Sequence, residues 1–160
     1  FRILNILDDY NRECLVSEGS ISFPAKRVID QLERLKEEIG LPSYIRTDNG
    51  PEFTSNDYKE WCEKNEVTPV YAEPGKPTQN GYIERLNRTF REDVLDAYMF
   101  NSINQFNIIS EKWKNDYNEY HPHQSLGHMS PKEYAPRVFN SFNNEKSLRD
   151  FSSLKCEKLA

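Results

Sequence analysis

A short strand that runs directly into a turn decides how this chain folds: Tyr44-Ile-Arg-Thr-Asp-Asn-Gly-Pro-Glu-Phe53. We predict a strand from Tyr44 to Thr47. The following Asp48-Asn-Gly-Pro51 ends it, because Asp, Asn, Gly and Pro all favour turns. In α/β sheets, ligands bind at the carboxyl ends of strands. Asp48 therefore occupies a position where a functional acid is expected.

Predicted strands and helices alternate on both sides of this segment. Strands are predicted at 2–7, 14–17 and 67–71, and the first two form a hairpin across a turn at 8–12. Helices are predicted at 24–39, 55–65, 78–96 and 102–120, with capping boxes at Ser102 and, for a short further helix, at Ser130. From about residue 138 onward the chain is polar and poorly periodic, which predicts a loose tail with one weak helix. This order favours an α/β fold with a mixed sheet flanked by helices.

Composition excludes several classes of protein. The chain has 160 residues, enough for one domain, and its 36% hydrophobic content argues against general disorder. No apolar run approaches the roughly 20 residues that span a bilayer, and the first residues do not resemble a signal peptide. The three cysteines, Cys14, Cys62 and Cys156, are far apart and lack metal-ligand spacing. Free thiols in a cytoplasmic protein are the simplest interpretation.

The charge is unevenly distributed along the chain. The net charge is -5, which argues against a uniformly basic protein that coats nucleic acid. Between Lys76 and Arg91, however, the net charge is +3, so the remainder carries -8. A local basic site therefore remains possible within an acidic protein.

A second candidate acid, Glu84, lies on the predicted helix at 78–96. Asn80, Glu84, Asn87 and Arg91 form a polar stripe opposite the apolar one, and 35 residues separate Asp48 from Glu84. Paired carboxylates on rigid elements suit Mg²⁺, and two such ions support phosphodiester chemistry. Taken singly, an Asp in an Asp-Asn-Gly turn is usually structural and a helical Glu is usually solvated.

Four stretches carry a resemblance to a known family: Ile6-Leu-Asp-Asp-Tyr-Asn-Arg12, Ile45-Arg-Thr-Asp-Asn-Gly-Pro-Glu-Phe53, Pro74-Gly-Lys-Pro-Thr-Gln-Asn-Gly-Tyr-Ile-Glu-Arg-Leu-Asn87 and Tyr117-Asn-Glu-Tyr-His-Pro-His123. Together they resemble the catalytic core of the retroviral-integrase-like DDE transposases of insertion elements. The resemblance implies a ribonuclease H-like fold, with a partial integrase core over 1–136 and a C-terminal tail over 137–160. It also implies metal-dependent cleavage of DNA at the element end and joining to target DNA. In that scheme Asp48 is the second and Glu84 the third catalytic acid, and both ligate Mg²⁺ or Mn²⁺, with two ions in the intact site.

The chain departs from the family at its start. The family's first, central strand and its catalytic Asp would precede residue 2, so we expect a sheet that lacks this strand and exposes two unpaired edges. An incomplete and inactive fragment is the resulting expectation. Asp8 and Asp9 match a different family position, and a turn role is favoured for them. His121 stands where the family usually has Arg, and a loop role is favoured over metal binding for His121 and His123.

The resemblance also implies partners. Six residues are candidates for contact with DNA at the element ends and the target: Lys76, Gln79, Asn80, Arg85, Arg88 and Arg91. The alternative is that Arg85 and Arg88 only cover a helix face. A homo-oligomer, or co-assembly with intact transposase, is expected in a cytoplasmic, nucleoid-associated setting without a membrane. The alternative function is a non-catalytic regulatory module that binds DNA or transposase.

Overall fold

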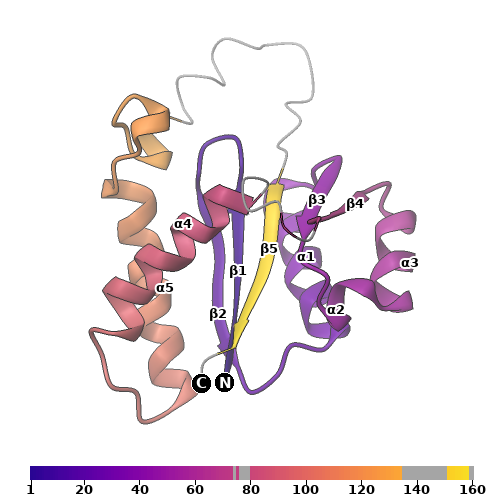
Figure 1. Ribbon diagram of the computed structural model, residues 1–160, viewed down its shortest axis with the longest axis horizontal. Helices are drawn as coiled ribbons and strands as arrows, with labels where there is room; N and C mark the ends of the chain where they lie inside the picture. Colours follow the sequence, from indigo (N-terminus) through magenta and orange to yellow (C-terminus); the bar gives the residue numbers. More distant parts are fainter. Residues whose placement is uncertain (74, 76–79, 135–150, 159–160) are drawn as a thin grey trace.

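The computed structural model describes residues 1–73, 75, 80–134 and 151–158, the last of these as backbone. One mixed five-stranded sheet in the order β2-β1-β5-β3-β4 forms its framework (Figure 1). The strands are β1 (Arg2–Asp8), β2 (Cys14–Ser20), β3 (Tyr44–Thr47), β4 (Thr68–Tyr71) and β5 (Phe151–Lys158). The predicted α/β class, mixed sheet and hairpin are confirmed.

Alternate residues of β1 point to opposite faces of the sheet, as strand geometry requires. Leu4 and Ile6 pack against Val28 and Leu32 in the largest apolar cluster. Three helices contribute to this face: α1 (Ala25–Ile39), α2 (Pro51–Thr54) and α3 (Asn56–Lys64). The short helix α2 was not predicted. It begins with Pro at its first position, directly after the Asp48–Gly50 turn.

The opposite face is covered by the second half of the chain. Ile3 packs with Phe90 and Phe106, and Leu7 packs with Ile83. The elements here are α4 (Gly81–Phe90), a π-helical turn η2 (Arg91–Leu95), α5 (Ile103–Tyr120) and the 3-10 turn η3 (Gln124–Leu126). Four residues of the predicted apolar stripe are buried, Ile83, Leu86, Phe90 and Val94, whereas its last residue, Ala97, is exposed. The predicted helix at 78–96 is α4 followed by a π turn, with 78 and 79 outside the described residues.

Most predicted helix ends are confirmed by hydrogen bonds. The Oγ atoms of Ser55 and Ser102 accept from backbone N–H groups three residues ahead, at 3.2 and 3.1 Å. Ser130 and Glu133 form a reciprocal capping box, in which each side chain accepts from the other residue's N–H. Gly40 ends α1 in a positive-φ conformation at 86°. These local signals needed no tertiary information.

The outer edge of β2 is shielded by side chains of α5. Asn107 accepts from the N–H of Gly19 at 2.7 Å and donates to its carbonyl at 3.1 Å. Asn118 makes the same pair of bonds with Cys14, at 2.8 and 2.9 Å. Between them, the Ser110 hydroxyl donates to a third β2 carbonyl at 2.8 Å. These bonds occupy backbone groups that would otherwise pair with a foreign strand.

The centre of the sheet is filled by the C-terminal segment of the chain. β5 runs antiparallel to β1 and parallel to β3, with Leu154 opposite Ile6 on one side and Thr47 on the other. The expected gap and the loose tail with a weak helix are therefore not seen over Phe151–Lys158. Unpaired strand edges present rows of N–H and C=O groups with which another strand can pair. Residues 135–150 and the predicted domain boundary near 136 lie outside the described residues.

Candidate functional site

Asp48 directly follows β3 and is half-buried. Its Oδ1 accepts a hydrogen bond from the backbone N–H of Gly50 at 2.9 Å, which holds the turn closed. The neighbouring Asn49 donates from Nδ2 to the carbonyl of Ala72 at 3.1 Å, just beyond β4. The turn that presents Asp48 is therefore tied to the ends of two adjacent parallel strands.

A third acid, Glu52, lies beside Asp48. A Cβ built on Gly50 would lie 3.0 Å from Asp48 Oδ1 and 2.9 Å from Glu52 Oε1. Gly50 has φ of -58°, which any residue can adopt, so it is the close approach of these two carboxylates rather than the backbone conformation that requires glycine here. The sequence did not single out Glu52, although its spacing of four from Asp48 is visible there.

Glu84 is exposed on a helix that is firmly held from below. Ile83 and Leu86 are buried on either side of it in the sequence. The guanidinium of Arg12, in the β1–β2 turn, lies 3.5 Å from the ring centre of Tyr82. These contacts fix the first turns of α4 against the sheet and leave the Glu84 side chain facing solvent.

Asn87 does not belong to the exposed polar stripe in which we had placed it. It is only 3% exposed, and its Oδ1 accepts from Nδ2 of Asn5 on β1 at 2.8 Å. Asn87 can be buried against the sheet because the side-chain amide of Asn5 on β1 pairs with it there. The bond sets the rotation of α4 about its axis, and so the direction of Glu84 one turn earlier.

The strand register relates Asp48 to α4. Thr47 pairs with Leu154, and the next residue of β5, Lys155, pairs with Asn5. Asp48 therefore stands level with Asn5, two strand spacings or roughly 10 Å across the sheet. Because α4 contacts both β1 and β5, the end of β3 and the first turns of α4 approach the same region of the sheet.

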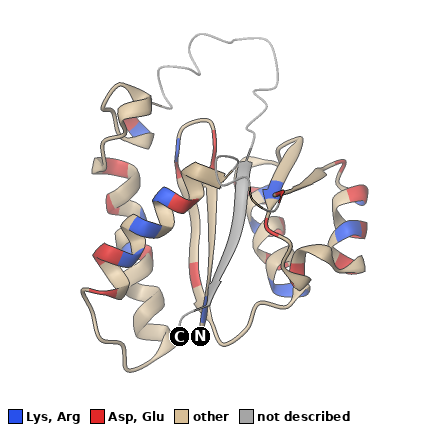
Figure 2. Ribbon diagram, in the orientation of Figure 1, with Lys and Arg blue, Asp and Glu red and all other residues tan. Residues whose placement is uncertain are grey.

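The candidate DNA-contact residues are only partly visible. Lys76 and Gln79 lie outside the described residues. Asn80 forms the N-cap of α4, and Arg85, Arg88 and Arg91 are exposed along α4 and η2. Figure 2 shows basic bands alternating with acidic ones along this helix. The basic side chains thus lie at the surface, but the surface is not uniformly positive.

The remaining predicted residues have structural contacts. Asp8 is buried, and its Oδ1 accepts from the N–H of Tyr10 at 2.9 Å, which fits the favoured turn role. Asp9 pairs with Arg12 at 3.8 Å. His123 is buried near Tyr117. Its pKa is lowered to about 4, mainly by burial and further by the nearby His121, Arg12 and Arg85.

The donors in this region suit a hard divalent cation in kind, because they are carboxylates on rigid elements. In the described part of the chain, however, no three His, Cys, Asp or Glu residues are grouped closely enough to hold a metal ion. Asp48 and Glu84 therefore fit such an ion by the chemistry of their donor atoms alone.

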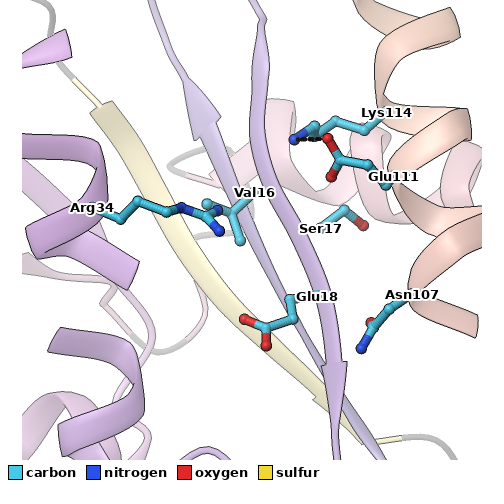
Figure 3. Close-up of a pocket in the computed structure, with 7 residues that line it drawn as sticks. All are labelled: Val16, Ser17, Glu18, Arg34, Asn107, Glu111 and Lys114. Atoms are coloured by element: carbon cyan, nitrogen blue, oxygen red, sulfur yellow. Dashed lines mark ion pairs between the residues drawn. The ribbon is translucent and has the colours of Figure 1, made fainter. Parts of the chain in front are cut away.

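A separate cavity of about 210 Å³ lies along β2, away from these acids. In Figure 3, Arg34 reaches toward it from α1, and Glu111 and Lys114 reach toward it from α5. Lys114 and Glu111 form an ion pair at 2.8 Å. None of the predicted site residues lines this cavity.

Among the helices that the structure describes, none is long and apolar enough to cross a bilayer.

The chain is similar in sequence to proteins of insertion elements. Two family models, both described as "Integrase core domain", match residues 1–77 and 65–131. An uncharacterized 31.7 kDa protein of insertion element IS407 from Burkholderia multivorans is 35% identical over 139 residues, which is 85% of this chain and 49% of that protein. A 39.2 kDa protein of IS476 from Xanthomonas euvesicatoria is 36% identical over 137 residues, or 84% and 39%. This chain spans half or less of these curated relatives.

Solved structures confirm the fold. The catalytic core domain of BIV integrase superposes with a TM-score of 0.66 at 19% identity, covering 88% of this chain and 90% of that one. The HTLV-2 integrase catalytic core in complex with magnesium, in its dimeric form, has a TM-score of 0.59 at 17% identity, covering 80% and 79%. The ribonuclease H-like mixed sheet that we predicted is therefore confirmed.

Proposed function

Because this chain belongs to the integrase core domain family, we propose that it acts in DNA transposition through a divalent-metal site held by Asp48 and Glu84. The relatives in insertion elements support this general role. Cleavage of phosphodiester bonds and joining of the freed 3′-hydroxyl to target DNA are the reactions proposed for the complete site.

The observation that carries the proposal is the alignment of Asp48 with α4. Ile45 packs with the cluster on the α1 face, and Thr47, two residues on, is also buried. Continued alternation directs Asp48 toward the opposite face, where α4 lies. The Asn5–Asn87 bond, level with Asp48, anchors α4 one turn after Glu84. This arrangement supports convergence of the two carboxylates on one side of the sheet.

Each residue has a distinct proposed task. Asp48, held by the turn at the end of β3, would be the acid closer to the attacking oxygen, and Glu84 would hold one ion alone. Bound Mg²⁺ or Mn²⁺ ions supply activation of the attacking oxygen and stabilisation of the leaving oxygen. Arg85 and Arg88 are exposed beside Glu84 and suited to phosphate contact. Lys76 and Gln79 remain proposed DNA contacts on the basis of sequence alone.

For the chain of 160 residues, we propose weak or absent strand transfer. At the level of Asp48, the central strand β5 carries Lys155 rather than an acid. Its acidic residue, Glu157, stands two residues further along, opposite Ile3. A site with only two assigned acids, Asp48 and Glu84, would hold two metal ions poorly. We therefore expect this chain to bind divalent cations measurably but to catalyse strand transfer weakly or not at all.

The regulatory alternative, which relied on co-assembly through unpaired strands, receives less support. Both inner edges pair with β5, and the outer edge of β2 is shielded by α5. We still propose that this chain assembles with itself or with intact transposase.

The test is Mn²⁺ titration by calorimetry on protein shown to be folded by circular dichroism. Asp48→Asn and Glu84→Gln are compared with the wild type and with Glu92→Gln, which removes a charge from an exposed residue just after α4. We expect binding to be lost in the first two variants and retained in the third. Binding that survives both Asp48→Asn and Glu84→Gln would refute a shared site.

A further inference from the structure

We propose that the ring of Tyr82, at the start of α4, is a platform on which an unpaired base at the end of the DNA stacks. This inference rests on the proposed function, because it names the part of the DNA that lies beside Glu84. It adds an aromatic contact to the basic and amide side chains already assigned to DNA binding.

Tyr82 is the exposed aromatic residue of α4. Its side chain is 43% exposed, whereas Phe90, the other aromatic residue of this helix, is buried. An exposed ring adds little to the core of the fold, but it offers a flat apolar surface. Bases of single-stranded nucleic acid stack on such rings, and this stacking tolerates any base because every base has a π face.

One face of the ring is already covered by a cation. The guanidinium carbon of Arg12 lies 3.5 Å from the ring centre of Tyr82. The Arg12 side chain is itself only 12% exposed, and it pairs with Asp9 at 3.8 Å. A guanidinium over an aromatic face is an attractive contact. It holds the ring in one orientation, so the exposed surface is the opposite face, and little order has to be imposed on the ring when a base binds.

The turn that carries Arg12 is held in an unusual conformation. Arg12 has a φ of 63°, in the left-handed region that residues with a Cβ rarely adopt. Asp8 fixes this turn, because its carbonyl accepts from the N–H of Arg12 at 2.8 Å and its Oδ1 accepts from the N–H of Tyr10 at 2.9 Å. Backbone strain of this kind is concentrated at ligand clamps and other functional sites. Here the strained residue is the one whose side chain supports Tyr82.

The surroundings of Tyr82 suit the phosphates that flank a stacked base. Arg85 is exposed three residues further along α4, and residues three apart lie on the same side of a helix. Burial lowers the pKa of His123, and the charges of Arg12 and Arg85 lower it further, so both cations lie near this one imidazole. A Cβ on Gly81 would meet no atom within 4 Å, which leaves room for a nucleotide to approach the ring.

The test is binding of a DNA duplex with a short single-stranded overhang, at its 5′ or its 3′ end, that carries the fluorescent base 2-aminopurine. Stacking on an aromatic ring quenches this fluorescence. Tyr82→Leu keeps apolar bulk without a ring, and Tyr82→Trp keeps a ring that can stack. Tyr98→Leu is the matched control, because Tyr98 is 52% exposed but lies beyond η2, past the other end of α4.

We expect quenching with wild type, Tyr82→Trp and Tyr98→Leu, and its loss with Tyr82→Leu, on proteins whose folding is checked by circular dichroism. Affinity for the overhang duplex should fall at least about fivefold in Tyr82→Leu, as expected for one lost base stack. Affinity for a blunt duplex should be the same in all four proteins. Equal overhang affinity and quenching in wild type and Tyr82→Leu would overturn the inference.

The results separate this inference from the proposed function. If wild-type protein binds blunt and overhang duplexes equally and without quenching, the inference is overturned and the proposed role in DNA binding stands. If quenching depends on Tyr82 but Mn²⁺ binding does not depend on Asp48 and Glu84, the inference holds and the proposed metal site fails.

A measurement on wild-type protein removes any dependence on how the variants fold. With 5-iodouracil in the overhang in place of 2-aminopurine, irradiation joins this base to an aromatic ring that stacks on it. We expect the crosslinked peptide, identified by mass spectrometry, to contain Tyr82. Crosslinks confined to other residues would overturn the inference.

Discussion

Nδ2 of Asn5 on β1 donates a 2.8 Å hydrogen bond to Oδ1 of Asn87 on α4, across 82 positions of sequence. Both side chains are buried, at 2% and 3% exposure. A buried polar pair specifies one relative placement of two elements, because any slip leaves both groups unsatisfied. Here it fixes the helix that carries Glu84 against the central part of the sheet.

Breaking this pair should destabilise the fold. We expect Asn87→Ala to lower the free energy of unfolding by about 1–3 kcal/mol, because the buried amide of Asn5 loses its partner. Urea unfolding followed by circular dichroism measures the change. The double variant Asn5→Ala/Asn87→Ala should cost less than the sum of the single variants. Strict additivity would mean that the bond contributes nothing.

Adding one methyl group at Gly19 should also be costly. A Cβ there would lie 2.5 Å from two ring atoms of Phe106, where α5 packs against β2. We expect Gly19→Ala to lower the free energy of unfolding by about 1–3 kcal/mol through overpacking. Gly81→Ala is the control, since its Cβ meets no atom within 4 Å in α4. Equal stability of the two variants would contradict this packing.

The sheet should depend on its C-terminal strand. A chain that ends at residue 150 would leave β1 and β3 without their shared partner, exposing two rows of backbone groups. We expect it to aggregate on size-exclusion chromatography, or to lose hydrogen-exchange protection in β1. Leu154→Pro should act in the same direction, because proline donates no ladder hydrogen bond. Unchanged exchange in both would show that β5 is dispensable.

Stability should fall at mildly acidic pH because of His123. Burial, reinforced by His121, Arg12 and Arg85, lowers its pKa from 6.5 to about 4, so the folded state holds the neutral imidazole. The unfolded chain binds a proton below pH 6.5. The contribution of His123 is therefore present above pH 6.5 and is lost as the pH falls toward 4, by up to about 2 kcal/mol.

The measurement is urea unfolding of wild type and His123→Phe at several pH values between 4 and 7. Carboxylates contribute their own pH dependence, so the difference between the two proteins is the quantity of interest. His128→Asn is the control: His128 is exposed and has a φ of 64°, which asparagine tolerates. A wild-type slope that His123→Phe leaves intact would rule out this histidine as the cause.

DNA affinity should depend on Arg88. We expect Arg88→Ala to weaken binding to duplex DNA and to reduce the slope of log K against log salt by about 1, as expected for one lost phosphate contact. Arg34→Ala on α1, an exposed arginine paired with Glu38, should leave the slope unchanged. The opposite pattern, in which only Arg34→Ala alters the slope, would move the DNA surface to the α1 face.

Local chemistry determined the elements that sequence alone could predict. Serine caps at positions 55, 102 and 130, the glycine after α1 and the apolar stripes of the helices act within a few residues, so their pattern is visible without a fold. The position of Asp48 at a strand end followed from the same short-range logic. The family resemblance added the expected ribonuclease H-like sheet.

Only the tertiary structure decided the relationships that join distant segments. The polar segment Phe151–Lys158 became the central strand because β1 and β3 presented unpaired edges, and nothing in its own composition indicates that place. Asn87 was buried because Asn5 faces it across the sheet. Gly50 has no room for a side chain because the carboxylates of Asp48 and Glu52 both approach it in the folded turn. Periodicity describes which face of an element is apolar, whereas contacts between elements depend on how those faces meet.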